Sequence, residues 1–430
     1  MTAAIVLIGS FFILVMLNVP IAISIGFSVL VYLFLGLGTL PVYFLATNMF
    51  TSCDSFPLMA IPFFVLAGGL MEKGGLSKRL VDFCETFVGH ITGGLAMVTV
   101  LACMFFGAIS GSAPATVAAI GAIMLPEMIK KGYDAVFSVA LIATAGILGI
   151  IIPPSIPMVM YGVASGESVG TMFMAGFIPG LLLTILLMVF SYFYCKKHGY
   201  EGNGLKFSFP RVWRGFKNAI LALLNPVIIL GGIYGGIFTP TEAATIAVIY
   251  AFVVGKFVYK ELSLPSLFKS LTNTAVTTGT ILIIVGTTNT LGKIFTLEQI
   301  PRMIASGILG ISDSPILILL VLNLFLLLVG MLMETTSAIL LLTPILLPVV
   351  ISIGMNPVHF GLMMIVNLGI GFITPPVGVN LFVACSMGNV SFERVAIKVI
   401  PMLLVMLVGL LLIAFVPALS LFIPHVLTGY

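Results

Sequence analysis

Two proline-containing stretches interrupt apolar segments of this sequence and have the composition of an ion-binding site. Gly149–Ser155 reads Gly-Ile-Ile-Ile-Pro-Pro-Ser, and Gly371–Val377, which begins 222 residues later, reads Gly-Phe-Ile-Thr-Pro-Pro-Val. Proline has no backbone N–H and clashes with the preceding helical turn. Each stretch is therefore expected to break a membrane helix and to expose carbonyl oxygens that need a polar partner. A cation or a polar solute would be such a partner, although a proline can also kink a membrane helix for packing alone.

A short cluster of small polar residues precedes each proline stretch. Ser110–Thr116 lies inside the apolar segment 92–129, and Met333–Ala338 lies inside 314–350. The arms of 92–129 are shorter than the roughly 20 residues that a full span needs, which favours a re-entrant hairpin with a polar turn. Two full spans are the alternative for this segment, where the small residues would serve close helix packing instead. We predict a second hairpin at 314–350.

We predict that each hairpin turn meets one proline stretch and that the two pairs form one transport site. Hydroxyl groups and freed carbonyl oxygens suit sodium, a hard cation, without any carboxylate, and new helix N-termini at the breaks would face an anionic substrate. The predicted sodium-site residues are Ser110, Ser112, Gly149, Ile152 and Pro153 in the first half, and Thr335, Thr336, Gly371, Thr374 and Pro375 in the second. The predicted substrate contacts are Ala113, Pro154, Ser155, Glu334, Ser337, Pro376 and Asn380.

Glu334 is the one carboxylate that we place deep in the membrane, where an acid is a functional candidate. It would bind a cation, relay a proton or be neutralised by hydrogen bonds to the turn. Asn367 and Asn380 flank the second proline stretch, where they would contact substrate or bond neighbouring helices. The two turns do not align strictly, because Ser112 falls opposite Glu334 at the offset of 222 residues. The second ion site is thus less regular than the first.

The composition indicates an all-α polytopic membrane protein. Of the 430 residues, 60% are hydrophobic and only 7% are charged, whereas soluble domains carry about 25% charged residues. The five cysteines and four histidines are scattered, without the spacing of a disulfide framework or a zinc site. No Ser/His/Asp arrangement, HExxH motif or P-loop occurs, so we do not expect an enzyme. The small net charge of +4 gives no reason to expect a nucleic-acid partner.

The apolar segments fall into two similar halves joined by a polar linker. The first half, residues 1–197, contains scaffold helices in 1–71, a surface arm helix at 76–88, the hairpin 92–129 and a broken helix at 135–163. The cytoplasmic linker is 198–217. The second half, residues 218–430, contains scaffold helices in 218–292, an arm helix at 297–309, the hairpin 314–350 and a broken helix at 357–386. We also predict a loop at 38–56, a connector at 262–271, a span at 272–292 and a last span at 395–423.

The distribution of Lys and Arg predicts the orientation of the chain. With ten full spans and two hairpins, sixteen of the eighteen basic residues fall on one face, which the positive-inside rule makes cytoplasmic. Both termini are then periplasmic. Each half has an odd number of spans, so the second half enters the membrane from the opposite side. Inverted repeats with broken helices that meet near the midplane are typical of secondary transporters.

The predicted arm helix at 76–88 has one apolar and one charged face. Leu76 and Leu80 lie on the apolar face with Phe83 and Phe87, and the charged face carries two basic and two acidic residues. This pattern is typical of a helix that lies along the membrane surface. A cytosolic connector is the alternative interpretation.

At these motifs the chain resembles the large membrane subunit of the tripartite ATP-independent periplasmic (TRAP) transporters. The matching stretches are Gly107–Thr116, the two proline stretches and Pro240–Ala244, and the likeness covers essentially the whole chain. The resemblance implies an elevator-type transporter in the bacterial inner membrane, in which a transport domain carries substrate and Na⁺ while a scaffold domain stays fixed. It assigns the family's sodium ligands to Ser110, Ser112, Gly149, Ile152 and Pro153.

The resemblance also implies partners and a cargo. A small membrane subunit would bind the scaffold, and a soluble periplasmic binding protein would deliver a small organic anion. We favour sialic acid from overall likeness, with C4-dicarboxylates and keto acids as other family substrates. Sodium-coupled symport is the leading hypothesis. The alternative is a proton-coupled or binding-protein-independent dicarboxylate carrier, which Glu334 would support. The paired hairpins argue against a channel, and the missing catalytic dyad argues against an intramembrane enzyme.

Overall fold

The computed structural model describes residues 2–17, 19–37, 40–301, 303 and 314–430. These residues form helices joined by turns and short loops, with no β-strand among them. Nine of the described helices are long and apolar enough to cross a membrane, and three of those nine are arms of the two hairpins. A polytopic helical membrane protein is thereby confirmed. The count of ten full spans and the inverted orientation of the two halves stay predictions.

Six of the described helices surround the first proline stretch. They are α6 (Gly94–Ser110), α7 (Ala113–Lys130), α8 (Ala135–Ala145), α9 (Leu148–Ile151), α10 (Ile156–Ser165) and α11 (Val169–Lys197). Gly111 forms the turn between α6 and α7 with a φ of 61°, which residues with a side chain rarely adopt. Asp134 caps α8 by accepting hydrogen bonds from the N–H groups of Val136 and Phe137 at 3.2 and 3.3 Å. The chain bends by 43° between α8–α9 and α10, at the two prolines.

The helices around the second proline stretch repeat this arrangement. They are α16 (Pro315–Leu332), α17 (Thr335–Ser352), α18 (Pro357–Gly371), α19 (Val379–Gly388), α20 (Phe392–Phe415) and α21 (Ala418–Thr428). α16 and α17 pack on α18, while α19 packs on α7 and α8 of the first half and α20 packs on α8 and α11. The peptide bond between the two prolines is cis in both stretches. We call α6–α11 and α16–α21 together the hairpin group.

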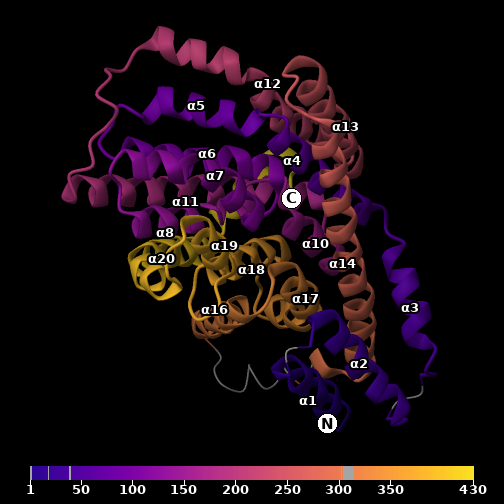
Figure 1. Ribbon diagram of the computed structural model, residues 1–430. Coiled ribbons are helices and arrows are strands. Elements are labelled where there is room, and N and C mark those ends of the chain that lie inside the picture. Colours follow the sequence, from indigo (N-terminus) through magenta and orange to yellow (C-terminus); the bar gives the residue numbers. More distant parts are fainter. Residues whose placement is uncertain (1, 18, 38–39, 302, 304–313) are drawn as a thin grey trace.

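The remaining helices form a second assembly, which we call the frame. They are α1 (Thr2–Met16), α2 (Ile21–Phe34), α3 (Phe44–Cys53), α4 (Ala60–Lys73), α5 (Leu76–Val88), α12 (Phe209–Tyr234), α13 (Pro240–Val253) and α14 (Leu264–Leu297), with a 3₁₀ turn at Phe56–Met59 and a π-helical turn at Val254–Val258. α4 packs against α13, and α5 packs against α12, so the frame also mixes the two halves. Figure 1 shows α14 running along one side of the molecule, where it contacts α2, α3, α4 and α17.

α14 is longer than the sequence predicted. It is continuous over Leu264–Leu297, in place of the predicted connector 262–271 and span 272–292. Ser263 caps its start by accepting a hydrogen bond from the Ser266 N–H at 3.2 Å. Several threonine hydroxyls of α14 donate to carbonyl oxygens one turn earlier, so the polar composition of this segment does not interrupt the helix.

Three other predicted boundaries are wrong. α12 starts at Phe209, inside the predicted linker 198–217. The proline in its first turn is compatible with this start, because the N–H group that proline lacks would have no helical partner at that position. α3 occupies part of the predicted loop 38–56 and packs against α14. The predicted last span 395–423 is two helices, because the chain breaks at Pro417 between α20 and α21.

The first predicted arm segment is a helix with the predicted bounds, and it packs against other helices of the protein. α5 covers 76–88 and packs against both α6 and α12. Leu76 and Leu80 are buried by these neighbours, whereas Phe87 is 53% exposed. The apolar face of α5 is therefore divided between protein contacts and the surface. Most of the predicted arm 297–309 lies outside the described residues.

Glycines let each hairpin approach its broken helix backbone to backbone. A Cβ atom on Gly107 of α6 would lie 2.8 Å from Gly149 Cα, and one on Gly330 of α16 would lie 2.9 Å from Leu368 Cα. A Cβ atom on Gly371 would overlap the carbonyl carbon of Gly330. Side chains at these contacts would push the helices apart, so small residues hold each hairpin against its proline stretch.

Replacing Gly107 or Gly330 with alanine should destabilise the protein by roughly 1–3 kcal/mol, because the new methyl group would overlap backbone atoms. Gly279 of α14 has no atom within 4 Å of its Cβ position. Gly279→Ala is therefore the matched control, and it should be neutral or slightly stabilising. The apparent melting temperature of each purified variant in detergent measures its stability relative to the wild type. Equal melting temperatures for Gly107→Ala and Gly279→Ala would contradict the packing argument.

Candidate functional site

Both hairpin turns and both proline stretches border one cavity of about 470 Å³. The first turn contributes Gly111–Pro114, and the second contributes Glu334–Ser337. Ile150 and Phe372 approach from the two proline stretches. The start of α2 and one face of α14 line the cavity from the frame. The cavity thus lies between the hairpin group and the frame, where the polar turns of the two halves meet.

The first turn brings three oxygen atoms together. Ser110 Oγ lies 2.9 Å from Thr116 Oγ1, and Thr116 Oγ1 donates to the Ser112 carbonyl at 2.8 Å. Ser110 Oγ lies 3.3 Å from the same carbonyl oxygen. A Cβ atom on Gly149 would overlap Thr116 Oγ1 and would lie 2.7 Å from the Ser112 carbonyl oxygen. Two of the three oxygens, Thr116 Oγ1 and the Ser112 carbonyl, therefore lie against the backbone of the first proline stretch. Hydroxyl and carbonyl oxygens are ligands that hard cations prefer.

One hydrogen bond within the first proline stretch and one backbone hydrogen bond to the first turn replace bonds that the prolines remove. Its two prolines supply no N–H to the carbonyl groups of Gly149 and Ile150, which lie one turn earlier. Ser155 Oγ donates to the Ile150 carbonyl at 2.6 Å, and the Ile156 N–H donates to the Gly111 carbonyl at 3.2 Å. The Gly149 carbonyl keeps no helical donor. It is one backbone oxygen that this stretch can offer to an ion.

Glu334 in the second turn caps α17 with its carboxylate. The carboxylate accepts hydrogen bonds from Thr336 Oγ1 at 2.8 Å, from the Ser337 N–H at 3.0 Å and from Ser337 Oγ at 3.4 Å. The side chain of Glu334 is exposed at the cavity. The Thr335 hydroxyl is buried, and no described residue bonds it. Hydrogen bonding within the turn is thus observed for Glu334, whereas cation binding and proton relay stay predictions.

The second proline stretch satisfies its own carbonyl groups. The Thr374 N–H donates to the Gly371 carbonyl at 3.0 Å, and the Asn380 N–H donates to the Phe372 carbonyl at 3.1 Å. Thr374 Oγ1 donates to the Ile370 carbonyl at 2.8 Å. These bonds occupy the oxygens that the two prolines would otherwise leave unpaired. The second stretch therefore offers an ion fewer free backbone oxygens than the first.

The structure brings some of the predicted site residues together and places others elsewhere. The predicted residues that line the cavity are Ser112, Ala113, Glu334, Thr335, Thr336 and Ser337. The predicted substrate contacts that do not line it are Pro154, Ser155, Pro376 and Asn380. The side chains of Ile152 and Pro153 line a different, apolar cavity of about 420 Å³ beside α11 and α12. An ion at the first site would therefore meet only backbone atoms of these two residues.

The two asparagines near the second proline stretch bond to other helices. Asn367 Nδ2 donates to the carbonyl group of Asn323 at 2.9 Å and to its side-chain oxygen at 2.8 Å. Asn380 Nδ2 donates to the Ala143 carbonyl of α8 at 3.0 Å. Of the two predicted roles, substrate contact and hydrogen bonding between helices, these contacts support hydrogen bonding between helices. Within the described residues, no group of three or more His, Cys, Asp or Glu side chains could hold a metal ion.

Sequence reasoning missed Thr116 and the polar face of α14. Thr116 belongs to the same polar cluster as Ser110, so its hydroxyl could have been included in the first site. Thr277 and Thr280 line the main cavity, and the signal for them is the threonine-rich composition of α14. A second cavity of about 270 Å³ shares Ser112 and Thr277 with the first, and it is also lined by Ser270, Asn273, Lys73 and Lys269.

Named relatives are similar to this chain over most of its length. The isethionate TRAP transporter permease protein DctMQ of Oleidesulfovibrio alaskensis is 47% identical over 97% of this chain and 66% of its own length. The C4-dicarboxylate TRAP transporter large permease protein DctM of Rhodobacter capsulatus is 40% identical over 99% of both chains. The sialic acid TRAP transporter large permease protein SiaM of Vibrio cholerae is 41% identical over 96% of both. These names describe transporter permeases and not enzymes, as the sequence predicted.

Two solved structures are similar to this one in fold. The YdaH transporter of Alcanivorax borkumensis has a TM-score of 0.62 at 15% identity, over 86% of each chain. MtrF of Neisseria gonorrhoeae has a TM-score of 0.57 at 14% identity, over 87% of this chain and 84% of its own. At these identities the likeness concerns the fold alone.

The family is identified by a model of its sequences. The model described as the DctM component of the tripartite ATP-independent periplasmic transporters matches residues 8–419. Together with relatives that are 40–41% identical over nearly the full length of both chains, this match shows that the chain belongs to the DctM family, the large permease subunits of TRAP transporters.

Proposed function

We propose that this permease carries a small organic acid across the bacterial inner membrane together with sodium ions. The observation that carries the proposal is the oxygen cluster of the first turn, where Ser110 Oγ, Thr116 Oγ1 and the Ser112 carbonyl lie beside Gly149. Oxygen ligands suit hard cations. The absence of a carboxylate among these oxygens favours a monovalent ion. The second turn and its proline stretch would form a weaker site, because their carbonyl groups are already bonded.

The cavity supports an anionic cargo of small size. Its volume of about 470 Å³ falls within the range of roughly 300–1,000 Å³ that is typical of small-molecule sites. The N-terminal end of α7, at Ala113, faces this cavity, and no side-chain oxygen caps its first turn. A helix N-terminus attracts anions through its free N–H groups and its dipole. An acidic group of the cargo would therefore lie at this end of the cavity, while Glu334 already occupies the N-terminus of α17.

The identity of the organic acid stays a prediction. Relatives at 40–47% identity are named for isethionate, C4-dicarboxylates and sialic acid. Overall likeness therefore does not separate these cargoes, and our preference for sialic acid rests on it alone. The shared chemistry is a small molecule with at least one acidic group, which is the class that the proposal names.

Transport would follow an elevator mechanism, in which the hairpin group moves against the frame. The location of the main cavity supports this, because its lining comes from both assemblies. The second cavity continues along α14 toward Lys73 and Lys269, which lie on the face predicted to be cytoplasmic. A small membrane subunit would hold the frame, and a periplasmic binding protein would deliver the cargo from the other side.

Replacing both Ser110 and Thr116 with alanine should weaken sodium binding roughly tenfold, because two of the three oxygens beside Gly149 are lost. Uptake by proteoliposomes that contain the permease and its partner subunits, measured over a range of sodium concentrations, gives the half-saturating concentration. Thr99→Ala is the control, because this buried hydroxyl of α6 donates to the Leu95 carbonyl of its own helix. A double variant whose sodium dependence matches that of Thr99→Ala would refute the proposed ion site.

The alternative, a proton-coupled carrier, makes Glu334 the group that titrates. We expect Glu334→Gln to keep the sodium dependence of uptake, since glutamine can still accept the hydrogen bonds that cap α17. Glu334→Ala should lower uptake and thermal stability more, because the cap is lost at a cost of about 1 kcal/mol. Uptake by the permease alone, driven by a pH gradient without sodium and abolished in Glu334→Gln, would instead establish the alternative.

A further inference from the structure

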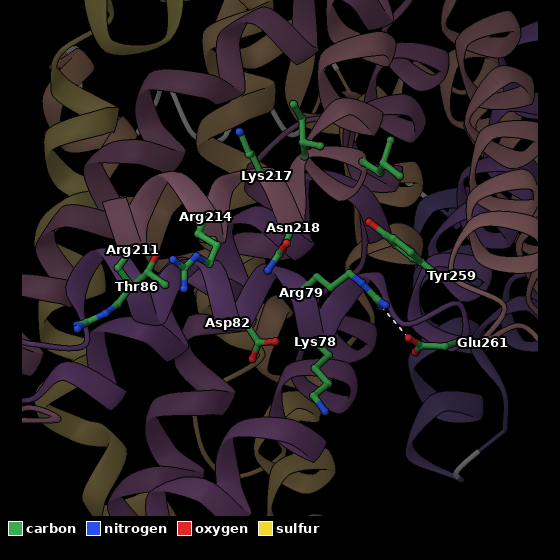
Figure 2. A pocket seen from close by; sticks show the side chains of 13 residues that line it. Lys78, Arg79, Asp82, Thr86, Arg211, Arg214, Lys217, Asn218, Tyr259 and Glu261 are labelled. Carbon is green, nitrogen blue, oxygen red and sulfur yellow. Dashed lines mark hydrogen bonds and ion pairs between the residues drawn. The ribbon is translucent and has the colours of Figure 1, made fainter. Parts of the chain in front are cut away.

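A second feature of the molecule is a charged pocket of about 840 Å³ that lies away from the transport cavity. It is formed by α5, by the first part of α12 and by the segment that follows the π-helical turn. Figure 2 shows Arg211, Arg214 and Thr86 at one end of the pocket, and Tyr259 and Glu261 at the other. No residue of the two hairpin turns or of the proline stretches lines it.

The pocket carries an excess of positive charge. Five of its residues are basic and two are acidic. Arg79 is already bound, because it donates to Glu261 Oε1 at 2.8 Å and lies 3.7 Å from the ring centre of Tyr259. The other four basic side chains form no salt bridge with any described residue. These four are Lys78, Arg211, Arg214 and Lys217.

The pocket lies where the charged first part of α12 passes into its apolar part. The first part of α12 carries the basic side chains, and the helix continues into the apolar segment from Ile220 onward. Trp213, the only tryptophan of the chain, stacks on Phe216 with 5.6 Å between the two ring centres. Lys217 Nζ lies 5.5 Å from the ring centre of Trp213. Tryptophan concentrates at the membrane–water interface, and Ile220 and Leu221 border the pocket on the apolar side.

We propose that this pocket binds the phosphate headgroup of an anionic phospholipid in the cytoplasmic leaflet. Arginine forms paired hydrogen bonds with phosphate oxygens. Arg214 forms no hydrogen bond or salt bridge with another described residue, and Arg211 donates only one hydrogen bond, from Nη1 to the Lys206 carbonyl at 3.4 Å. Basic pockets on the cytoplasmic side of membrane helices recognise acidic headgroups through the same chemistry. The apolar border of the pocket would receive the upper part of the acyl chains, which a soluble phosphate does not have. A lipid held here would contact both α5 and α12 and would brace this part of the frame.

The test uses the fluorescence of Trp213 in the full chain, reconstituted with phospholipids that carry brominated acyl chains. Brominated phosphatidylglycerol should quench this tryptophan with roughly tenfold higher apparent affinity than brominated phosphatidylcholine. The triple variant R211Q/R214Q/K217Q should lose the preference. The matched control is K130Q/K131Q/K197Q, which removes three exposed charges elsewhere on the basic face and should keep it. The ratio of the apparent affinities for the two lipids is compared between variants, because this ratio does not depend on the fluorescence intensity of each variant.

Other outcomes overturn the proposal. A triple variant that prefers phosphatidylglycerol as the wild type does would show that the pocket is not the site. Loss of the preference on addition of millimolar inorganic phosphate would identify a soluble anion as the occupant instead. The single variant R214Q repeats the test if the triple variant does not fold, and an unchanged preference there and in R211Q would count equally against the proposal.

Discussion

A backbone carbonyl group inside a membrane must have a polar partner, and this constraint organises the candidate site. Each Pro-Pro pair removes two N–H groups from a buried helix, so two carbonyl groups one turn earlier lose their donors. The second stretch replaces both donors with its own N–H groups, from Thr374 and Asn380. The first replaces one, through the Ser155 hydroxyl. The Gly149 carbonyl keeps no such donor, and the Cα of Gly149 lies against the oxygens of the first hairpin turn, which is why the proposed cation site is placed there.

Close packing makes that arrangement reachable. A hairpin turn can supply ligands to a broken helix only if the two backbones lie almost in contact. Gly107 against Gly149 and Gly330 against Gly371 provide such contacts in the two halves. The same closeness brings both turns to one cavity, which the frame closes through α14. The site is therefore a property of the interface between two assemblies, so a relative shift of the assemblies would change access to it.

The sequence was sufficient to predict the elements that carry strong local signals. Prolines in apolar runs predicted both breaks, and clusters of small polar residues predicted both turns. Both features leave polar groups in the membrane that need a partner, so each is a strong local signal. Other features depended on contacts between distant segments. The continuity of α14 could not be predicted from polarity, since hydroxyls such as that of Thr280 are satisfied inside the helix. The hydrogen bond from Asn380 to the Ala143 carbonyl likewise follows from packing between distant segments that no local pattern encodes.

The inequality of the two halves has a consequence for how transport would be coupled. An ion at the first turn would find oxygens that lie close together already, so little rearrangement would accompany its binding. An ion at the second turn would have to compete with the bonds to Gly371 and Phe372, or else use the Thr335 hydroxyl, which is buried without a partner among the described residues. Glu334 precedes Thr335 in the chain and is exposed to the cavity that the cargo would enter. Rearrangement at the second turn would therefore be sensitive to the cargo. The first turn, whose Ser112 and Ala113 line the same cavity, would bind its ion with less rearrangement.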